Sequence, residues 1–139
     1  MKISSKPTTY IIDGLNFVRS YIMGYNTSEE DVTQEFLKWI FEIADYPPFD
    51  QSSFRIIFDG SFRGSGPIVK GNVKVTYTED VSADELIAEQ AIYLHGKEER
   101  VCVVTSDLSL KNELASEGVK TMFCDGFFQG VKEKTRREK

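Results

Sequence analysis

The sequence has 139 residues, of which 40% are hydrophobic and 28% charged, and its formal net charge is −5. This length and composition suit a single globular domain with its own core. No apolar run approaches the roughly 18 residues needed to span a bilayer, and residues 1–6 lack the apolar segment of a secretory leader, so we expect a cytoplasmic protein. One histidine and two cysteines are too few for a structural zinc site or a disulfide scaffold.

The acidic charge is concentrated before residue 132. Residues 132–139 hold five basic and two acidic side chains, a net charge of +3, which leaves −8 for residues 1–131. We expect one domain over residues 1–131, followed by a frayed basic tail over residues 132–139. The negative charge of residues 1–131 argues against a broad basic surface that binds duplex nucleic acid, and it is compatible with a carboxylate-rich metal site.

Predicted strands and helices alternate along the chain. Apolar, β-branched runs predict strands at residues 10–12, 54–60, 73–77, 101–105 and 119–123. Capping residues and helical spacing predict helices after Ser28, after Ser82 and from Leu108 to Gly118, with a short helix or irregular segment at 17–23. Residues 61–71 hold three glycines and a proline and are expected to form a loop. The alternation predicts an α/β fold around a mainly parallel sheet of about five strands.

Three of the predicted strands run into an aspartate, namely Asp13, Asp59 and Asp107. In a parallel sheet with right-handed crossovers, the carboxyl ends of the strands lie on one edge, where open α/β sheets bind their ligands. Asp84, in the first turn of a helix that follows another strand, adds a fourth carboxylate. Asn16, three residues after Asp13, is placed to turn its amide toward the same edge.

Carboxylates gathered in one crevice repel each other, and a hard divalent cation relieves this repulsion. Oxygen ligands favour Mg²⁺ or Mn²⁺, either of which keeps several water molecules. Beside a phosphodiester such an ion polarises the phosphoryl oxygen and activates water. The pattern therefore predicts a phosphodiesterase-type metal site, with Asp13 and Asp107 as the innermost ligands.

Each aspartate also has a purely structural explanation. Asp107 is placed to cap the helix that follows it, as is Ser106. Asp84 complements a helix dipole, and Asp59, like Asp13, precedes a glycine in turn-forming sequence. We favour one shared site over these alternatives. Otherwise four separate structural explanations, one for each aspartate, would have to be correct for residues predicted at the same edge of one sheet.

Other catalytic classes lack their residues. The sequence has no P-loop motif for nucleotide phosphates, and its single histidine has no partner for triad hydrolysis. A phosphoaspartyl phosphatase would need an aspartate two residues after Asp13, where this chain has Leu15.

Four stretches resemble, in order, the motifs of NYN domains, especially the YacP-like branch of the PIN-like nucleases. They are Ile11-Ile12-Asp13-Gly14-Leu15-Asn16, Ile56-Ile57-Phe58-Asp59, Ser82-Ala83-Asp84-Glu85 after Val75-Thr76-Tyr77-Thr78, and Val103-Val104-Thr105-Ser106-Asp107. The resemblance covers residues 8–123. It implies a three-layer, Rossmannoid PIN-like fold and a metal-dependent endoribonuclease that uses Mg²⁺ or Mn²⁺.

The resemblance also implies roles for individual residues. The catalytic centre would comprise Asp13, Asn16, Asp59, Asp84 and Asp107, and its four aspartates would be the metal ligands. The implied partner is single-stranded or structured RNA, and association with the ribosome or translation stays open, as does the oligomeric state. The candidate phosphate contacts are Arg19, Arg55, Arg63, Lys70 and Lys74, with Phe62 as a stacking residue. Two alternative functions stay open. One is a catalytically inactive module that binds RNA or a protein, and the other is a metal-dependent phosphatase.

Overall fold

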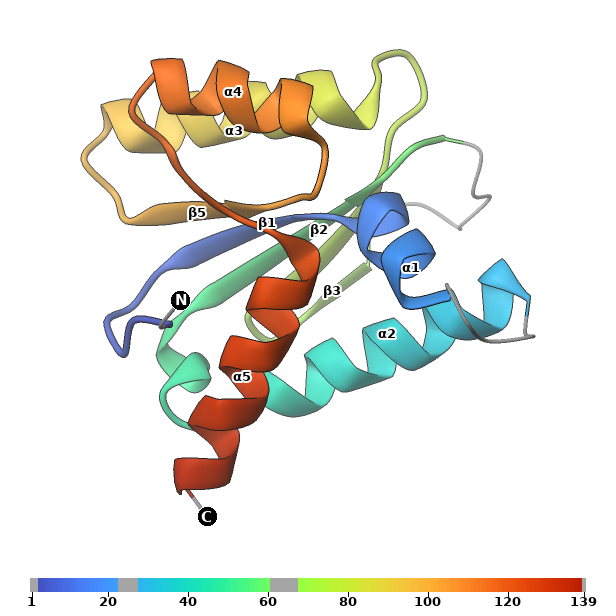
Figure 1. Cartoon of the computed structure of the whole chain (residues 1–139), viewed down its shortest axis with the longest axis vertical. Helices are drawn as coiled ribbons and strands as arrows, with labels where there is room; N and C mark the ends of the chain where they lie inside the picture. The colour runs from blue at the N-terminus through green and yellow to red at the C-terminus, as the bar shows by residue number, and fades with distance from the viewer. Residues whose placement is uncertain (1–2, 23–27, 61–67, 139) are drawn as a thin grey trace.

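The computed structural model describes residues 3–22, 28–60 and 68–138 (Figure 1). Its strands are β1 (Thr9–Asp13), β2 (Ser53–Phe58), β3 (Ile68–Lys70), β4 (Val73–Tyr77), β5 (Val101–Val104) and β6 (Lys120–Met122). Its helices are α1 (Gly14–Ile22), α2 (Glu29–Ile43), α3 (Ala83–Gly96), α4 (Leu108–Ser116) and α5 (Cys124–Glu138), with a short 3₁₀ helix at Phe49–Gln51.

The six described strands form one sheet in the order β3-β4-β2-β1-β5-β6. All neighbours pair in parallel except β3, which runs antiparallel to β4 at the edge. β1 lies in the middle of the sheet, because β2 pairs with one of its sides and β5 with the other. The mainly parallel α/β sheet predicted from the alternation of elements is confirmed.

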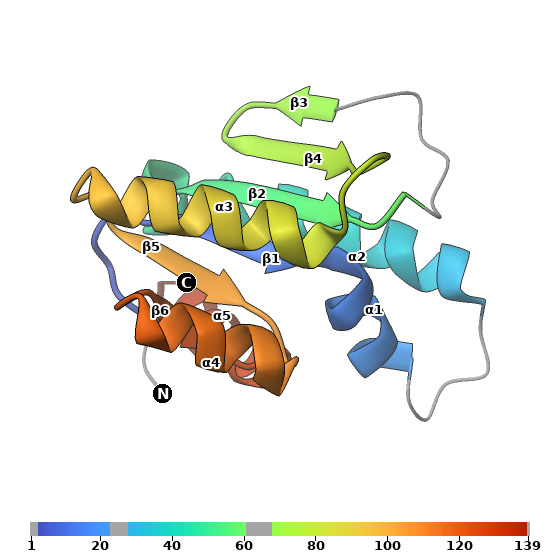
Figure 2. The ribbon, with the colours of Figure 1, turned by 90° about the horizontal axis from the view of Figure 1, so that it is seen from above.

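Helices cover both faces of the sheet and make three layers (Figures 1 and 2). In Figure 1, α3 and α4 lie above the sheet, and α1, α2 and α5 lie below it. Successive side chains of a strand point to opposite faces. Ile11 accordingly packs in the cluster with α3 and α4, whereas Ile12 packs in the cluster with the other three helices. No helix in the described part of the chain has the length and apolar character needed to cross a membrane.

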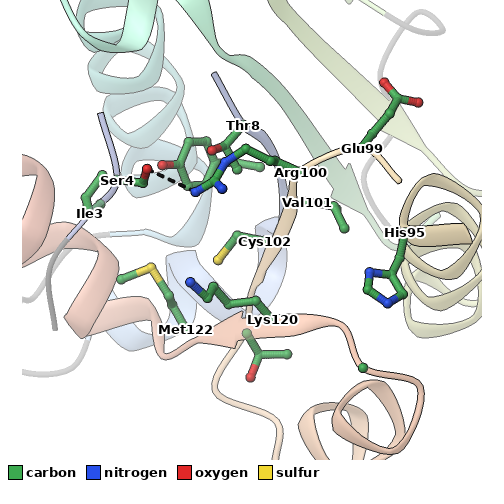
Figure 3. Close-up of a pocket in the computed structure, with 13 residues that line it drawn as sticks. Ile3, Ser4, Thr8, His95, Glu99, Arg100, Val101, Cys102, Lys120 and Met122 are labelled. Carbon is green, nitrogen blue, oxygen red and sulfur yellow. Dashed lines mark hydrogen bonds between the residues drawn. The ribbon is translucent and has the colours of Figure 1, made fainter. Parts of the chain in front are cut away.

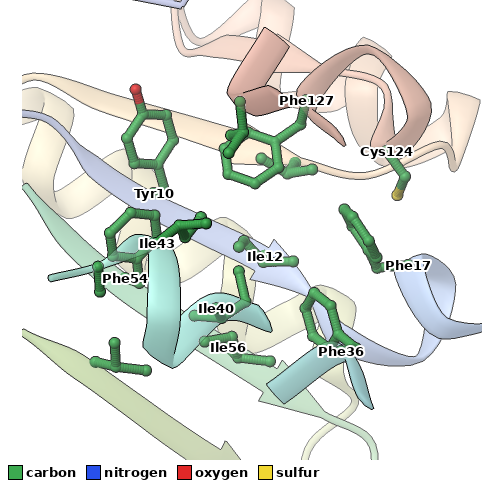
Figure 4. Packing of buried hydrophobic residues seen from close by; sticks show 14 of the residues in the cluster. Tyr10, Ile12, Phe17, Phe36, Ile40, Ile43, Phe54, Ile56, Cys124 and Phe127 are labelled. Atoms are coloured by element: carbon green, nitrogen blue, oxygen red, sulfur yellow. The ribbon is translucent and has the colours of Figure 1, made fainter. Parts of the chain in front are cut away.

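The larger core cluster is rich in aromatic rings (Figure 4). Phe17 of α1 stacks on Phe36 of α2 with ring centroids 4.6 Å apart, and Phe127 of α5 lies 5.3 Å from Tyr10 of β1. Phe17 also lies 6.3 Å from Phe127, so these ring contacts link the three helices to the central strand. The predicted helix after Ser28 is α2, which buries Val32, Phe36, Ile40 and Ile43, and its Trp39 is partly buried against the same cluster.

Two elements differ from the sequence-based predictions. Part of the expected loop at 61–71 is strand β3, which is only three residues long and turns into β4 through Gly71 at a φ of 59°. Where a frayed tail was expected at 132–139, the structure continues α5 to Glu138. Val131 and Phe127 are fully buried and anchor this helix, while the charged residues beyond them carry no apolar pattern that would reveal it.

Candidate active site

The structure brings the four predicted aspartates to the carboxyl edge of the sheet, which we call the acidic edge. Asp13 is the last residue of β1, and Asp59 directly follows β2. Asp84 is the second residue of α3, and Asp107 stands at the start of α4. Their charges interact, because Asp84 and Asp107 raise the pKa of Asp13, and Asp107 and Asp59 raise that of Asp84.

Asp13 is the buried member of the group, with 6% of its surface exposed. Its Oδ1 accepts a hydrogen bond from the Asn16 backbone N–H at 3.3 Å, and its Oδ2 accepts one from the Thr105 hydroxyl at 3.2 Å. Burial is the main cause that raises the pKa of Asp13 to about 6, and the neighbouring carboxylates raise it further. The two hydrogen bonds act in the opposite direction and lower it. A carboxyl group held in this way is half protonated near pH 6, well above the range in which an ordinary aspartate loses its proton.

Asp107 is the N-cap of α4, so the structural explanation offered by the sequence is correct for one of its oxygens. Oδ1 accepts hydrogen bonds from the backbone N–H groups of Ser109 and Leu110, at 2.9 and 3.2 Å. Among the described residues none donates a hydrogen bond to Oδ2, which leaves that oxygen available to a ligand. Capping fixes the carboxylate in one orientation and does not exclude a role at the acidic edge.

Asp84 and Asp59 are exposed at the same edge. Desolvation of its carboxyl group raises the pKa of Asp84, with further contributions from Asp107, Asp59 and Glu113. Ser82, not Asp84, caps α3, since its side chain accepts the Glu85 N–H at 3.1 Å. The Asp84 side chain is therefore not needed to begin the helix.

Asn16 connects three segments that are far apart in the sequence. Its side-chain Oδ1 accepts a hydrogen bond from the Ser106 N–H at 2.6 Å and another from the Cys124 thiol at 3.4 Å. Its backbone N–H holds Asp13. The backbone of Asn16 thus holds Asp13, while its side chain fixes the loop after β5 and the start of α5.

Sequence reasoning did not assign a role at the site to Thr105 or Glu113. The fully buried Thr105 hydroxyl donates to Asp13 and accepts the Asp107 N–H at 3.2 Å, so it links the Asp13 carboxylate to the backbone of Asp107, the two residues predicted to be the innermost ligands. The sequence offered one indication of this role, since Thr105 follows strand β5 and lies two residues before Asp107. Glu113 is an exposed residue of α4 whose charge reaches Asp84. Nothing in a sequence separates such a glutamate from ordinary surface charge.

The donor set at the acidic edge fits a hard divalent cation. In the described part of the chain, no three acidic, histidine or cysteine side chains already lie close enough together to enclose a metal ion. Mg²⁺ does not require such a cage, because it is commonly bound by one or two carboxylates and keeps several waters. Burial is the main cause of the raised pKa values of Asp13 and Asp84, and the repulsion between the carboxylates, which adds to it, is what a bound cation would relieve.

Of the predicted phosphate contacts that the structure describes, those on β2, β3 and β4 lie away from this edge. Arg19 is exposed on α1 and pairs with Glu29 at 3.2 Å. Arg55 donates to Gln90 at 3.0 Å from the first half of β2. Lys70 and Lys74 lie at the end of β3 and the start of β4, near the amino ends of the parallel strands. Phe62 and Arg63 fall outside the described residues.

A cavity of about 470 Å³ lies at the opposite, amino end of the sheet (Figure 3). Its lining includes Thr8 before β1, Arg100 before β5 and Lys120 at the start of β6. Cys102, which also lines it, is buried and forms no disulfide, and burial raises the pKa of its thiol to about 11. None of the predicted site residues lines this cavity, so the acidic edge is a separate and open feature.

Comparison with solved structures supports the fold. The crystal structures of Rae1 (YacP) from Bacillus subtilis, wild type and a point mutant, superpose with TM-scores of 0.72 and 0.70 at 19% and 20% sequence identity. Each match covers 93% of this chain, and the two cover 76% and 77% of the Rae1 chains. At this identity the likeness shows the fold alone.

The family comparison is more specific. No curated protein matches the chain significantly. The family model of the YacP-like NYN domain matches residues 10–139, which include all four aspartates of the acidic edge. NYN domains form a nuclease family, and PIN-like nuclease domains generally use divalent metal ions. The chain therefore belongs to the YacP-like NYN domain family.

Proposed function

We propose that this protein is an endoribonuclease that hydrolyses RNA phosphodiester bonds with Mg²⁺ or Mn²⁺ at the acidic edge. The observation that carries the proposal is the state of Asp13, a buried carboxyl group at the end of the central strand whose pKa is raised to about 6 beside Asp84 and Asp107. A perturbed titratable group among like charges at a strand end is typical of functional sites rather than of turns. Membership of a nuclease family supports the reaction class.

The residues divide into fixed and solvent-accessible members. Asp13 is held by two hydrogen bonds and Asp107 by its capping bonds, so both keep a defined orientation without a ligand. Asp59 and Asp84 are exposed and complete the site from the side open to a polymeric substrate. A divalent ion bound by these carboxylates would supply polarisation of the phosphoryl oxygen and a lowered pKa of bound water. The hydrogen bonds of Thr105 and Asn16 keep the segments that carry Asp13 and Asp107 in fixed relative positions.

One observation favours the alternative of an inactive module that binds RNA or a protein. Half of the Asp107 carboxylate is already used in capping α4, and in the described residues no group of three ligands gathers around one point. An inactive module would bind its partner whether or not a divalent ion is present, and it would not need Asp13.

The test compares cleavage of one labelled single-stranded RNA by the wild type, by Asp13→Asn and by Asp45→Asn. Asp45 is an exposed aspartate just after α2 and serves as the matched control for the substitution. We expect the wild type and Asp45→Asn to cut with Mg²⁺ or Mn²⁺, and Asp13→Asn or excess chelator to abolish cutting. DNA of the same sequence and p-nitrophenyl phosphate identify a deoxyribonuclease or a phosphatase. Equal cleavage by Asp13→Asn would refute the proposed site.

A further inference from the structure

We propose that Phe123 and Lys111 form a nucleotide subsite at the acidic edge, which binds one unpaired base and the adjoining phosphate of single-stranded RNA. This inference rests on the proposed function, because it assigns the substrate contacts of the same site. The base would stack on the exposed side of the Phe123 ring, and the Lys111 ammonium would lie near the phosphate. Neither residue was among the RNA contacts predicted from the sequence.

The backbone holds Phe123 at the acidic edge. It directly follows β6, whose last residue, Met122, accepts a hydrogen bond from the Thr105 N–H at 3.0 Å. The next residue, Cys124, donates its N–H to the Ser106 hydroxyl at 3.2 Å. Phe123 is therefore fixed from both sides to the Thr105–Ser106 segment that precedes Asp107.

The Phe123 side chain points to the α4 side of the sheet. Met122 packs in the core on the other face, and the alternation of side chains along a strand directs Thr121 and Phe123 toward α4. Lys111 of α4 confirms this direction, since its Nζ donates to the Thr121 hydroxyl at 2.9 Å and lies 4.1 Å from the centroid of the Phe123 ring. The ring nevertheless keeps 43% of its surface exposed.

Lys111 stands one helical turn beyond Asp107, whose carbonyl accepts its backbone N–H at 3.0 Å. A cation thus lies within one turn of a carboxylate predicted to bind the metal. Residues 1–131 carry a net charge of −8, and this charge repels the RNA backbone. The Lys111 ammonium would offset part of this repulsion for a phosphate group that approaches the acidic edge.

An exposed aromatic ring beside a cation is the arrangement that single-strand binding surfaces use. A base stacks on the ring whatever its identity, and the cation contacts the backbone. Leu108, next to Asp107 and 63% exposed, adds a second apolar surface beside the same carboxylate. In a duplex each base is stacked between neighbouring base pairs, which cover the faces that would stack here, so the subsite selects unpaired RNA.

The chain contains a matched pair at the other end of the molecule. Tyr93 is 64% exposed, and Lys97 lies 5.3 Å from its ring centroid. Both residues belong to the carboxyl end of α3, and His95 between them lines the cavity at the amino end of the sheet. This pair has the same chemistry as Phe123 and Lys111 without the acidic edge, so it provides the control.

The experiment measures binding of a fluorescein-labelled single-stranded RNA by anisotropy in the Asp13→Asn background, so that the RNA stays intact. Phe123→Leu, which keeps apolar volume but removes the aromatic face, should weaken binding about tenfold, and Phe123→Tyr should restore it. Lys111→Met should weaken binding and lower the dependence of log K on log salt by about one. Tyr93→Leu and Lys97→Met should change neither value. Thermal melts establish that each variant is folded.

With Asp13 intact, Phe123→Leu should raise KM about tenfold while kcat stays within about twofold, because the subsite positions RNA and does not touch the reacting atoms. Binding that is equally insensitive to Phe123→Leu and Tyr93→Leu would overturn the subsite while leaving the nuclease proposal intact. If the wild type fails to cleave RNA, the nuclease proposal fails, and the binding series still decides whether Phe123 contacts RNA.

Discussion

Replacement of Asp13 by asparagine should make the protein more stable near neutral pH as well as inactive. The pKa of Asp13 rises from 3.8 to about 6 on folding, because burial disfavours its charge. Between these values the folded protein keeps a proton that the unfolded chain has released. Stability therefore falls as pH rises from about 4 to about 6 and stays low above that, which is the sign that proton linkage requires.

The magnitude follows from the shift. About two pKa units, at about 1.4 kcal/mol each, correspond to about 3 kcal/mol of destabilisation once Asp13 is ionised. Asparagine removes this cost, although its amide must replace the bond that the Thr105 hydroxyl now donates. Part of the gain, about 1 kcal/mol, is lost there. We expect Asp13→Asn to be about 2 kcal/mol more stable than the wild type at pH 7 and nearly equal to it at pH 4.

Urea unfolding in the presence of chelator, at several pH values between 4 and 8, measures this difference for the two proteins. The Asp45→Asn variant controls for the general effect of removing a carboxylate, because Asp45 is exposed. A stability difference between wild type and Asp13→Asn that does not grow with pH would show that Asp13 is not held as a strained carboxylate, and the physical basis of the proposed site would be wrong.

Three further outcomes are expected. Millimolar Mg²⁺ or Mn²⁺ should raise the melting temperature of the wild type but not of Asp13→Asn, and an equal rise in both would place the ion elsewhere. Thr105→Val should cost about 1–3 kcal/mol in urea unfolding and lower kcat, because the buried Asp13 carboxylate and the Asp107 N–H both lose a partner; unchanged stability would contradict this network. Gly14→Ala should destabilise by several kcal/mol, since its Cβ would stand 2.6 Å from the buried Phe58 ring, and a variant with native melting behaviour would argue against that packing.

Much of the fold follows from local pattern. β1, β2 and β5 are short apolar runs that end in polar residues, and the residues that cap α2 and α3, Ser28 and Ser82, both accept the N–H three residues on. Strand ends in a parallel sheet share an edge, so the positions of the aspartates followed from the element order alone. The family resemblance, which rested on these same motifs, is confirmed.

Other features depend on contacts that a sequence does not display. Gly14 does not adopt a left-handed φ, and the lack of space beside the Phe58 ring is what requires a glycine there. α5 contains Gly126 and Gly130 and ends in charged residues, so its docking through Phe127 was hidden. The capping role of Asp107 was expected from the sequence, whereas the burial of Asp13 and its raised pKa depend on neighbours that a sequence does not display.

The side chain of Asn16 has a consequence for how the site is maintained in the native protein. Its Oδ1 binds the amide of Ser106, 90 residues later in the chain, and that amide proton can exchange with solvent only when the junction opens. The exchange rate of this one proton therefore reports how often the arrangement of the proposed site comes apart while the rest of the sheet stays folded. If it exchanges much faster than the amides of β1, the resting protein spends measurable time with its site disassembled.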